Sequence, residues 1–146
     1  MTVVDPYKSG MFKKDPYYTK RDCEGDLCVV LDGKYENRGL KLMVPPSRAF
    51  LVGEIHELIV TDEQEAKPGA DVNRIAYWGF MEVTKATVVV SGDEISIGDK
   101  CVGVIAGFDE THMPNHLNVV IRANERIPGA DLGLALEDKV RITKKG

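Results

Sequence analysis

The sequence has no apolar run near the roughly 20 residues that a membrane-spanning helix needs, so we expect no membrane association. Its three cysteines, Cys23, Cys28 and Cys101, are odd in number and lack the spacing of a disulfide framework or a zinc knuckle. The segment Met1 to Lys14 has lysines among prolines and tyrosines where a secretory signal has an apolar core. These absences predict a cytoplasmic protein with reduced thiols.

Sequence motifs of common enzyme classes are missing as well. The chain contains no G-x-x-x-x-G-K-[ST] phosphate loop, no G-x-G-x-x-G between a strand and a helix, and no G-x-S-x-G nucleophile elbow. Nucleotide hydrolysis and the commonest serine hydrolases therefore lose support. The net charge of -4 also disfavours a domain whose whole surface binds nucleic acid.

The first 25 residues differ from the rest of the chain. They interleave basic and aromatic residues and are interrupted by Pro6 and Pro16. The basic and aromatic residues are Tyr7, Lys8, Phe12, Lys13, Lys14, Tyr17, Tyr18, Lys20 and Arg21. We expect a flexible or wrapping arm over residues 1–25 and a single domain over residues 26–146. We expect the arm to pack against its own domain or a neighbouring subunit; the alternative, which is less favoured, is that it stacks on single-stranded nucleic acid.

From Leu27 onward, short β-branched and aliphatic runs are separated by glycines, which is typical of several short strands. The predicted strands are Leu27–Leu31, Leu40–Val44, Ile55–Val60, Val72–Val83, Thr87–Val90, Glu94–Ile97, Cys101–Phe108, Leu117–Ala123 and Lys139–Thr143. Turn residues predict two hairpins, one through Ser91-Gly92-Asp93 and one through Gly98-Asp99.

Helical periodicity is weak. Ser47 is a candidate helix cap, but Gly53 interrupts the apolar positions after it and Ile59 and Val60 favour a strand, so we predict a strand there. Asp62 to Lys67 predicts a single helical turn. The expected fold is mostly β, a small closed or partly open β-barrel with at most one or two short helical turns.

An internal repeat is visible when the chain is shifted by 60 residues. Residues 56–71 and 116–131 then agree at seven of sixteen positions, including a leading histidine and a Pro-Gly-Ala-Asp ending. Each copy predicts a strand followed by a type II turn, with Gly69 or Gly129 at positive φ. Duplication would build the barrel from two pseudo-equivalent halves and place His56 and His116 in equivalent positions; the alternative is convergent turn chemistry.

The densest polar cluster follows an apolar strand and contains two of the three histidines. A turn through Met113-Pro114-Asn115-His116 is expected to fold His112 back towards His116. The predicted ligand-binding rim of the barrel consists of His56, Asp109, His112, Asn115 and His116.

Three roles are open for this cluster. A divalent metal, zinc or iron, would take its ligands from His56, His112, His116, Asp109 and Glu110. Without a metal, the histidines and carboxylates are suited to acid and base catalysis. The third role is structural, because Asp, Thr and Asn side chains commonly bond to nearby backbone groups and lock a turn.

Tyr77-Trp78-Gly79-Phe80 contains the only tryptophan. In a regular strand Trp78 and Phe80 share one face, which either belongs to the core or lines a ligand cleft, and Gly79 permits close approach to its backbone. Cys101, inside an apolar strand, is expected to be a small buried hydrophobic residue.

Several motifs between Arg38 and Val140 together resemble an uncharacterised family of bacterial and archaeal proteins. The motifs are Pro-x-Ser-Arg at 45–48, His-Glu-Leu at 56–58, Tyr-Trp-Gly-Phe at 77–80 and Asp-Glu-Thr-His-Met-Pro-Asn-His at 109–116. The resemblance implies no activity, catalytic residue or ligand.

The sequence thus leaves three functions open. The first is binding of a small molecule or a protein partner at the polar rim. The second is a metal-dependent enzyme that uses His56, His112 and His116. The third is an interaction module whose basic aromatic arm engages RNA or another protein.

Overall fold

The computed structural model describes residues 16–145. Within this range the chain forms strands β1 (Cys23–Val30), β2 (Lys34–Tyr35), β3 (Leu40–Lys41), β4 (Ser47–Phe50), β5 (Ile55–Thr61), β6 (Asp71–Val72), β7 (Ile75–Lys85), β8 (Thr87–Val90), β9 (Glu94–Ile97), β10 (Lys100–Asp109), β11 (Asn118–Arg122) and β12 (Lys139–Thr143), and one short helix, α2 (Gly129–Leu132). The expected mostly β fold is confirmed.

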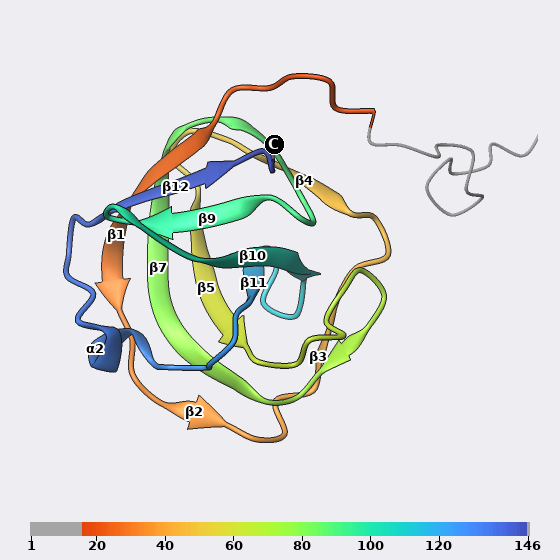
Figure 1. Ribbon diagram of the computed structural model, residues 1–146, viewed down its shortest axis with the longest axis vertical. Helices are drawn as coiled ribbons and strands as arrows, with labels where there is room; N and C mark the ends of the chain where they lie inside the picture. The colour runs from red at the N-terminus through yellow and green to blue at the C-terminus, as the bar shows by residue number, and fades with distance from the viewer. Residues whose placement is uncertain (1–15, 146) are drawn as a thin grey trace, which may run out of the picture.

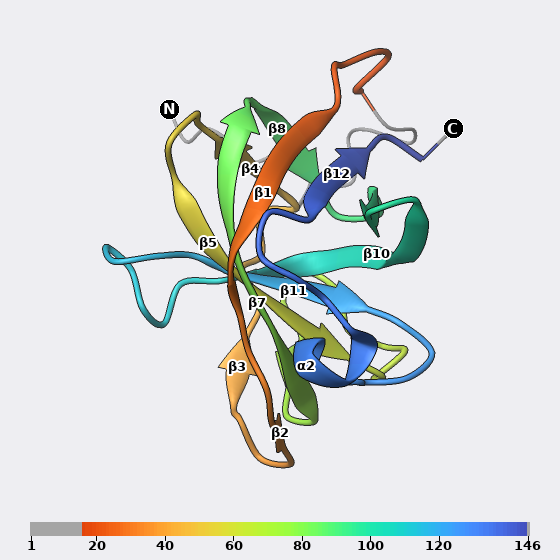
Figure 2. The same ribbon diagram turned by 90° about the vertical axis from the view of Figure 1, so that its left-hand side faces the viewer.

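Seven strands close on themselves in the order β1-β12-β9-β10-β11-β5-β7, because β7 also pairs with β1. Figure 1 looks down this barrel-like ring, and Figure 2 shows it from the side. Strand β2 extends the far end of β7, and two small sheets, β3-β6 and β4-β8, stand outside the ring order. Closure matters because it leaves no long unpaired edge among the ring strands.

The core of the protein has two parts. Buried side chains from all seven ring strands form the main cluster, which therefore fills the inside of the ring; its largest members are Trp78, Phe50 and Phe108. A second cluster lies on the opposite face of β5 and β11, where Ile59 and Val120 contact Leu40, Leu42 and Val72 from the β3-β6 region. Central strands β5 and β11 are thus buried on both faces, as their continuous apolar sequences indicate.

Most predicted strands are present, but one predicted hairpin and the extent of one predicted strand were wrong. The turn at Gly92 forms, with the Asp93 amide donating to the Val90 carbonyl. However, β8 pairs with β4 while β9 pairs with β10 and β12, so of the two predicted hairpins only the one at Gly98 forms. The predicted single strand over residues 72–83 is divided into β6 and β7 by Asn73 and Arg74.

The two repeated segments contain adjacent parallel strands. Val119 of β11 is paired with Leu58 of β5, an offset one residue larger than that of the sequence repeat. Their Pro-Gly turns differ. Gly69 has the expected positive φ of 88°, whereas Gly129 does not and begins α2, so the predicted type II turn at 128–129 is wrong. Duplication of the two halves stays a prediction.

A β-bulge in β7 separates the two large aromatic residues expected on one face. The pairing of β5 with β7 shifts between Leu58 and Ile59, which breaks the strict alternation of side chains. Trp78 therefore lies in the main core, where its indole N–H donates to the Ile127 carbonyl, while Phe80 contacts His116. Gly79 does permit close approach, because a Cβ there would lie 2.1 Å from the Val29 carbonyl oxygen.

Two cysteines differ in environment. Cys101 is exposed, contrary to the expected burial, because β10 becomes buried only from Ile105 onward. Cys23 is fully buried in the main core, and this burial raises the pKa of its thiol to about 12. The three cysteines are free thiols.

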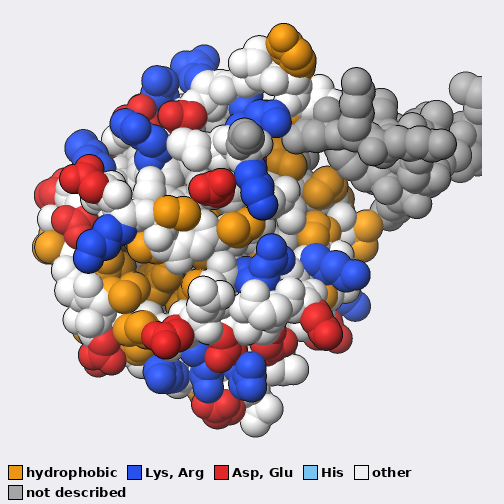
Figure 3. Space-filling view, viewed as in Figure 1, with side chains coloured by type: hydrophobic (Ala, Val, Ile, Leu, Met, Phe, Trp, Pro, Cys, Tyr) orange, Lys and Arg blue, Asp and Glu red, His pale blue; other side chains and the backbone are white. Residues whose placement is uncertain are grey.

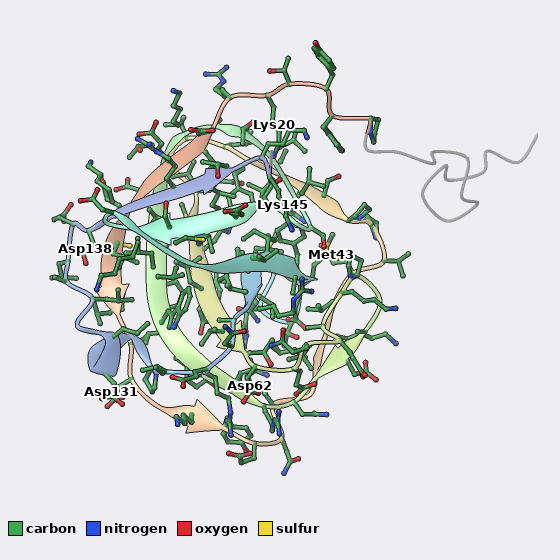
Figure 4. All side chains as sticks on the ribbon, viewed as in Figure 1. Lys20, Met43, Asp62, Asp131, Asp138 and Lys145 are labelled. Atoms are coloured by element: carbon green, nitrogen blue, oxygen red, sulfur yellow. The ribbon has the colours of Figure 1, made fainter. Side chains whose placement is uncertain are left out.

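Residues 16–22 precede β1 and are fixed to the ring by Lys20, which points inward in Figure 4. Its ammonium donates to the Val88 carbonyl and pairs with Asp93. Strand β1 begins at Cys23, inside the range expected to form an arm, and residues 1–15 of that range lie outside the described part of the chain.

The face shown in Figure 3 has no patch of a single charge, because lysine and arginine side chains are mixed there with aspartate and glutamate. Within residues 16–145, no helix has the length and apolar character that crossing a membrane requires.

Candidate functional site

The loop between β10 and β11 carries most of the predicted site residues and projects from the side of the ring in Figure 2. The Asn115 amide donates to the His112 carbonyl over 2.9 Å, so the turn begins one residue earlier than expected. The His112 ring does fold back: its centroid lies 5.1 Å from that of His116. Further contacts tie the loop to the sheet: Arg38 Nη2 lies 2.9 Å from His112 Nε2, and Arg48 pairs with Glu110 at 3.2 Å.

Asp109 holds the base of this loop and does not line a pocket. Its side chain is buried and accepts hydrogen bonds from the backbone amides of Lys41 and Thr111 and from the Asn118 side chain. Burial alone would raise the pKa of Asp109, but the hydrogen bonds from Thr111, Lys41 and Asn118 hold it below the usual value. The carboxylate is therefore a structural anchor, as in the locked-turn hypothesis.

His56 lies at the start of β5 with its ring packed on Phe50, centroid to centroid 4.8 Å. Its Nδ1 accepts a hydrogen bond from the Leu117 amide, so the neutral ring carries its proton on Nε2 and donates it to Glu54 Oε1 over 3.1 Å. Burial lowers the pKa of His56, although Glu54 opposes this. His56 is thus a buried, oriented and neutral imidazole at neutral pH.

His116 forms a second pair of the same kind on the other face of the sheet. Its Nε2 lies 3.1 Å from Oε1 of Glu57, and its Nδ1 lies 2.9 Å from the side-chain nitrogen of Asn115. Both members of the pair are largely buried, with 13% of the His116 side chain and 9% of the Glu57 side chain exposed. Phe80 contacts the ring edge to face at 5.0 Å.

Three polar residues and a phenylalanine form a row across the sheet beneath the loop. Asp109, Asn118, Glu57 and Phe80 are consecutive cross-strand neighbours on β10, β11, β5 and β7. The first three are buried, and the Oδ1 atom of Asn118 has no hydrogen-bond partner among the described residues. Buried polar side chains are costly, and a row of them beside a pocket marks a candidate functional site.

Both histidines and Glu54 line one pocket of about 370 Å³, whereas Glu57 is outside its lining. One side of the pocket is the start of β5, from Gly53 to His56, and the other is the loop segment from Met113 to His116. The pocket is of the size that binds small molecules in proteins. Of the five residues predicted to form the rim, it contains His56, Asn115 and His116; His112 packs behind His116, and Asp109 lies at the base of the loop.

A larger groove of about 550 Å³ lies over β9 and β12. It is lined by charges of both signs, among them Asp99, Lys139 and Arg141, and Lys139 pairs with Asp26 at the surface. Its lining includes no histidine and no largely buried ion pair, so the smaller pocket has the more distinctive chemistry.

The predicted metal ligands are not gathered into one cluster. Within residues 16–145, no group of three or more His, Cys, Asp or Glu side chains is placed to hold an ion. The lone-pair nitrogen of His56 accepts from the Leu117 amide, that of His116 faces the Asn115 side chain, and that of His112 faces the Arg38 guanidinium. Asp109 is occupied at the loop base, and Glu110 pairs with Arg48.

The glutamates of the site, Glu54 and Glu57, were not predicted. Glu54 has its pKa lowered despite burial, because the Leu51 amide and His56 donate hydrogen bonds to it. The sequence does contain a signal for one of them, since Glu57 directly follows His56. It serves His116 instead, which follows only from the pairing of β5 with β11.

The depressed pKa of His56 predicts a pH-dependent stability. Unfolding exposes an imidazole with an ordinary pKa near 6.5, so below this pH the unfolded state binds more protons and the free energy of unfolding falls. In His56→Asn, whose side-chain oxygen can still accept from the Leu117 amide, we expect a smaller fall between pH 7 and pH 5.5. Urea unfolding at these two pH values measures the free energy of unfolding of each protein.

The matched control is His112→Asn, because His112 is exposed. This variant should keep the wild-type dependence on pH. If the free energy of unfolding fell equally with pH in wild type and in His56→Asn, the assignment of the depressed pKa to His56 would be contradicted.

Comparison with known proteins gives one result. A family model described as a family of unknown function (DUF6917) matches residues 17–143. No curated protein and no solved structure matches the chain.

Proposed function

The chain belongs to this family of unknown function, DUF6917, so its role has to be inferred from its own site, and we propose that it binds a small, uncharged molecule in the pocket between residues 53–56 and 113–116. One observation carries the proposal. Two largely buried imidazoles, each oriented by its own glutamate at 3.1 Å, open on the same pocket. Such convergence of fixed polar groups is typical of ligand sites.

The pocket walls indicate the character of the ligand. Ile55, Met113 and Pro114 supply apolar surface, and Glu54, His56, Asn115 and His116 supply hydrogen-bonding groups. Two glutamates at or beside the pocket disfavour an anion there. A molecule with an apolar part and one or two hydrogen-bonding groups is complementary to these walls.

Blocking the pocket is expected to abolish binding. Ile55 is 47% exposed and lines the pocket, so Ile55→Trp fills it without disturbing the core. Uncharged fragments are screened by protein-observed NMR, and binders should shift the amide signals of residues 53–56 and 113–116 saturably. We expect their affinity to fall at least about tenfold in Ile55→Trp, because the bulky ring occupies the site.

Leu136→Trp is the matched control, since Leu136 is also exposed, at 62%, but lies outside the pocket lining. Its affinities should equal those of the wild type. The proposal fails if no fragment perturbs the pocket amides, or if the fragments bind Ile55→Trp as well as they bind Leu136→Trp.

A further inference from the structure

The Glu57–His116 pair has the geometry of an oriented general base. An ionised glutamate accepts a hydrogen bond from the Nε2–H of His116, so the lone pair of the ring lies on Nδ1. Nδ1 points away from Glu57 and towards the Asn115 side chain, which lines the pocket. A carboxylate behind an imidazole fixes its tautomer and stabilises the cation that forms when Nδ1 takes a proton.

Rigid elements hold this pair in place. Glu57 lies within β5, and its backbone amide donates to the Leu117 carbonyl over 3.0 Å. Phe80 and His112 pack on the His116 ring, at centroid distances of 5.0 and 5.1 Å. A catalytic group gains from such preorganisation, because little rearrangement is needed at the moment of reaction.

His56 provides an internal comparison. It has a glutamate partner at the same distance, but its Nδ1 accepts from the fixed backbone amide of Leu117, and its side chain is only 5% exposed. The corresponding nitrogen of His116 accepts instead from the side chain of Asn115, an exposed residue. A bound molecule or a water that displaces the Asn115 side chain would therefore reach the lone pair of His116, whereas the lone pair of His56 is held by the backbone.

We propose that His116, supported by Glu57, is the general base for hydrolysis of a small neutral carboxylic ester bound in this pocket, an inference that rests on the proposed function. Nδ1 takes a proton from water as the water oxygen forms a bond to the acyl carbon. The C–O bond to the alcohol then breaks, and the departing oxygen receives the proton from Nδ1. The products are the carboxylic acid and the alcohol, and water is the only co-reactant.

The surroundings favour a neutral ester over a phosphate ester. Glu54 and Glu57 disfavour a negatively charged substrate. Ile55, Met113 and Pro114 provide apolar surface for a short acyl chain.

Hydrolysis of 4-nitrophenyl butyrate by the full chain tests the proposal. We expect saturable kinetics, a slower reaction in D2O, and a fall in kcat/KM of at least about 100-fold in His116→Gln, the usual contribution of a general base. Glu57→Gln should lower kcat more than it raises KM, because it removes support for the imidazolium. Cys101→Ser removes an exposed thiol that also reacts with such esters, and it should leave the rate unchanged.

Asn115→Ala keeps the proposal testable if the buried variants unfold, because Asn115 is exposed. Uncovering Nδ1 should raise kcat at least about twofold, and an unchanged kcat contradicts a base at this atom. Fragment binding without ester hydrolysis, or equal hydrolysis by wild type and folded His116→Gln, overturns this inference and leaves the proposed function standing. The absence of both binding and hydrolysis overturns both.

Discussion

Replacing Gly129 with alanine is expected to lower the free energy of unfolding by about 3 kcal/mol or more, the upper range for overpacking a buried site. A Cβ at this position would lie 2.1 Å from the Trp78 carbonyl oxygen and 3.1 Å from that of Leu31. Both are backbone atoms, so neither moves aside as a flexible side chain would. Because the indole of Trp78 also bonds to Ile127, the clash displaces the segment that leads into α2 from β7.

Gly133 is the matched control, at the C-terminal end of the same helix. It has a positive φ of 75°, but a Cβ at this position would have no neighbour within 4 Å among the described residues, so Gly133→Ala suffers only the backbone strain, about 1 kcal/mol. The free energies of unfolding of both variants are measured in urea. Gly129→Ala reports the cost of a steric clash, and Gly133→Ala reports the cost of backbone strain at a positive φ. If Gly133→Ala lost more stability than Gly129→Ala, the close contact between Gly129 and the Trp78 carbonyl of β7 would be contradicted.

Replacing Asp109 with alanine is expected to destabilise the protein by about 3–5 kcal/mol at pH 7. The change leaves the partly buried amides of Lys41 and Thr111 and the buried side-chain nitrogen of Asn118 without their acceptor. The loop from β10 to β11 would lose its base, so signals of the pocket residues should broaden or shift in NMR spectra. Chemical denaturation measures the loss.

Glu110→Ala is the control for Asp109→Ala, since the neighbouring carboxylate is exposed and pairs only with Arg48 in an ion pair of little stabilising value. The pH dependence provides a second check. The pKa of Asp109 is lowered in the folded state, so its contribution is present above the ordinary value of 3.8 and is lost as the pH falls through the folded value. The difference between wild type and Asp109→Ala should therefore shrink in acid, and a constant difference would contradict the ionised anchor.

The strands of this protein were predictable because their apolar runs are bounded by turn residues, but the pairing of those strands was not. Gly92 and Asp93 do form a turn, yet β8 leaves the ring order and pairs with β4. Asp93 also forms an ion pair with Lys20, which lies in a distant segment of the sequence. Local turn chemistry sets where a chain reverses, whereas the partner of a strand depends on contacts far away in the sequence.

The repeated Pro-Gly-Ala-Asp sequence illustrates the same limit. Gly69 turns with a positive φ in an open place, while Gly129 begins a helix because only a glycine can pass beneath the Trp78 carbonyl. One tetrapeptide thus adopts two conformations, and each is selected by what packs against it.

The candidate site was only half visible in the sequence. The histidines were found because they cluster with polar residues and recur in the repeat. Their glutamate partners depend on strand register: Glu57 points away from the adjacent His56 and reaches His116, 59 residues along the chain. The metal hypothesis stays a prediction: within residues 16–145, no group of three or more His, Cys, Asp or Glu side chains is placed to hold an ion.

Ring closure also has a consequence for how the chain folds. Cys23 of β1 is paired with Ile142 of β12, and β5 is paired in parallel with β11, so the ring depends on contacts between segments 60 or more residues apart. Such contacts are slow to form, because the chain loses the entropy of a long loop before the strand pairs contribute any stabilising contacts. During synthesis β12 is the last ring strand to leave the ribosome. Until it inserts, β1 and β9 each keep one unpaired edge, which makes the nascent chain most prone to association with other chains just before its last strand arrives.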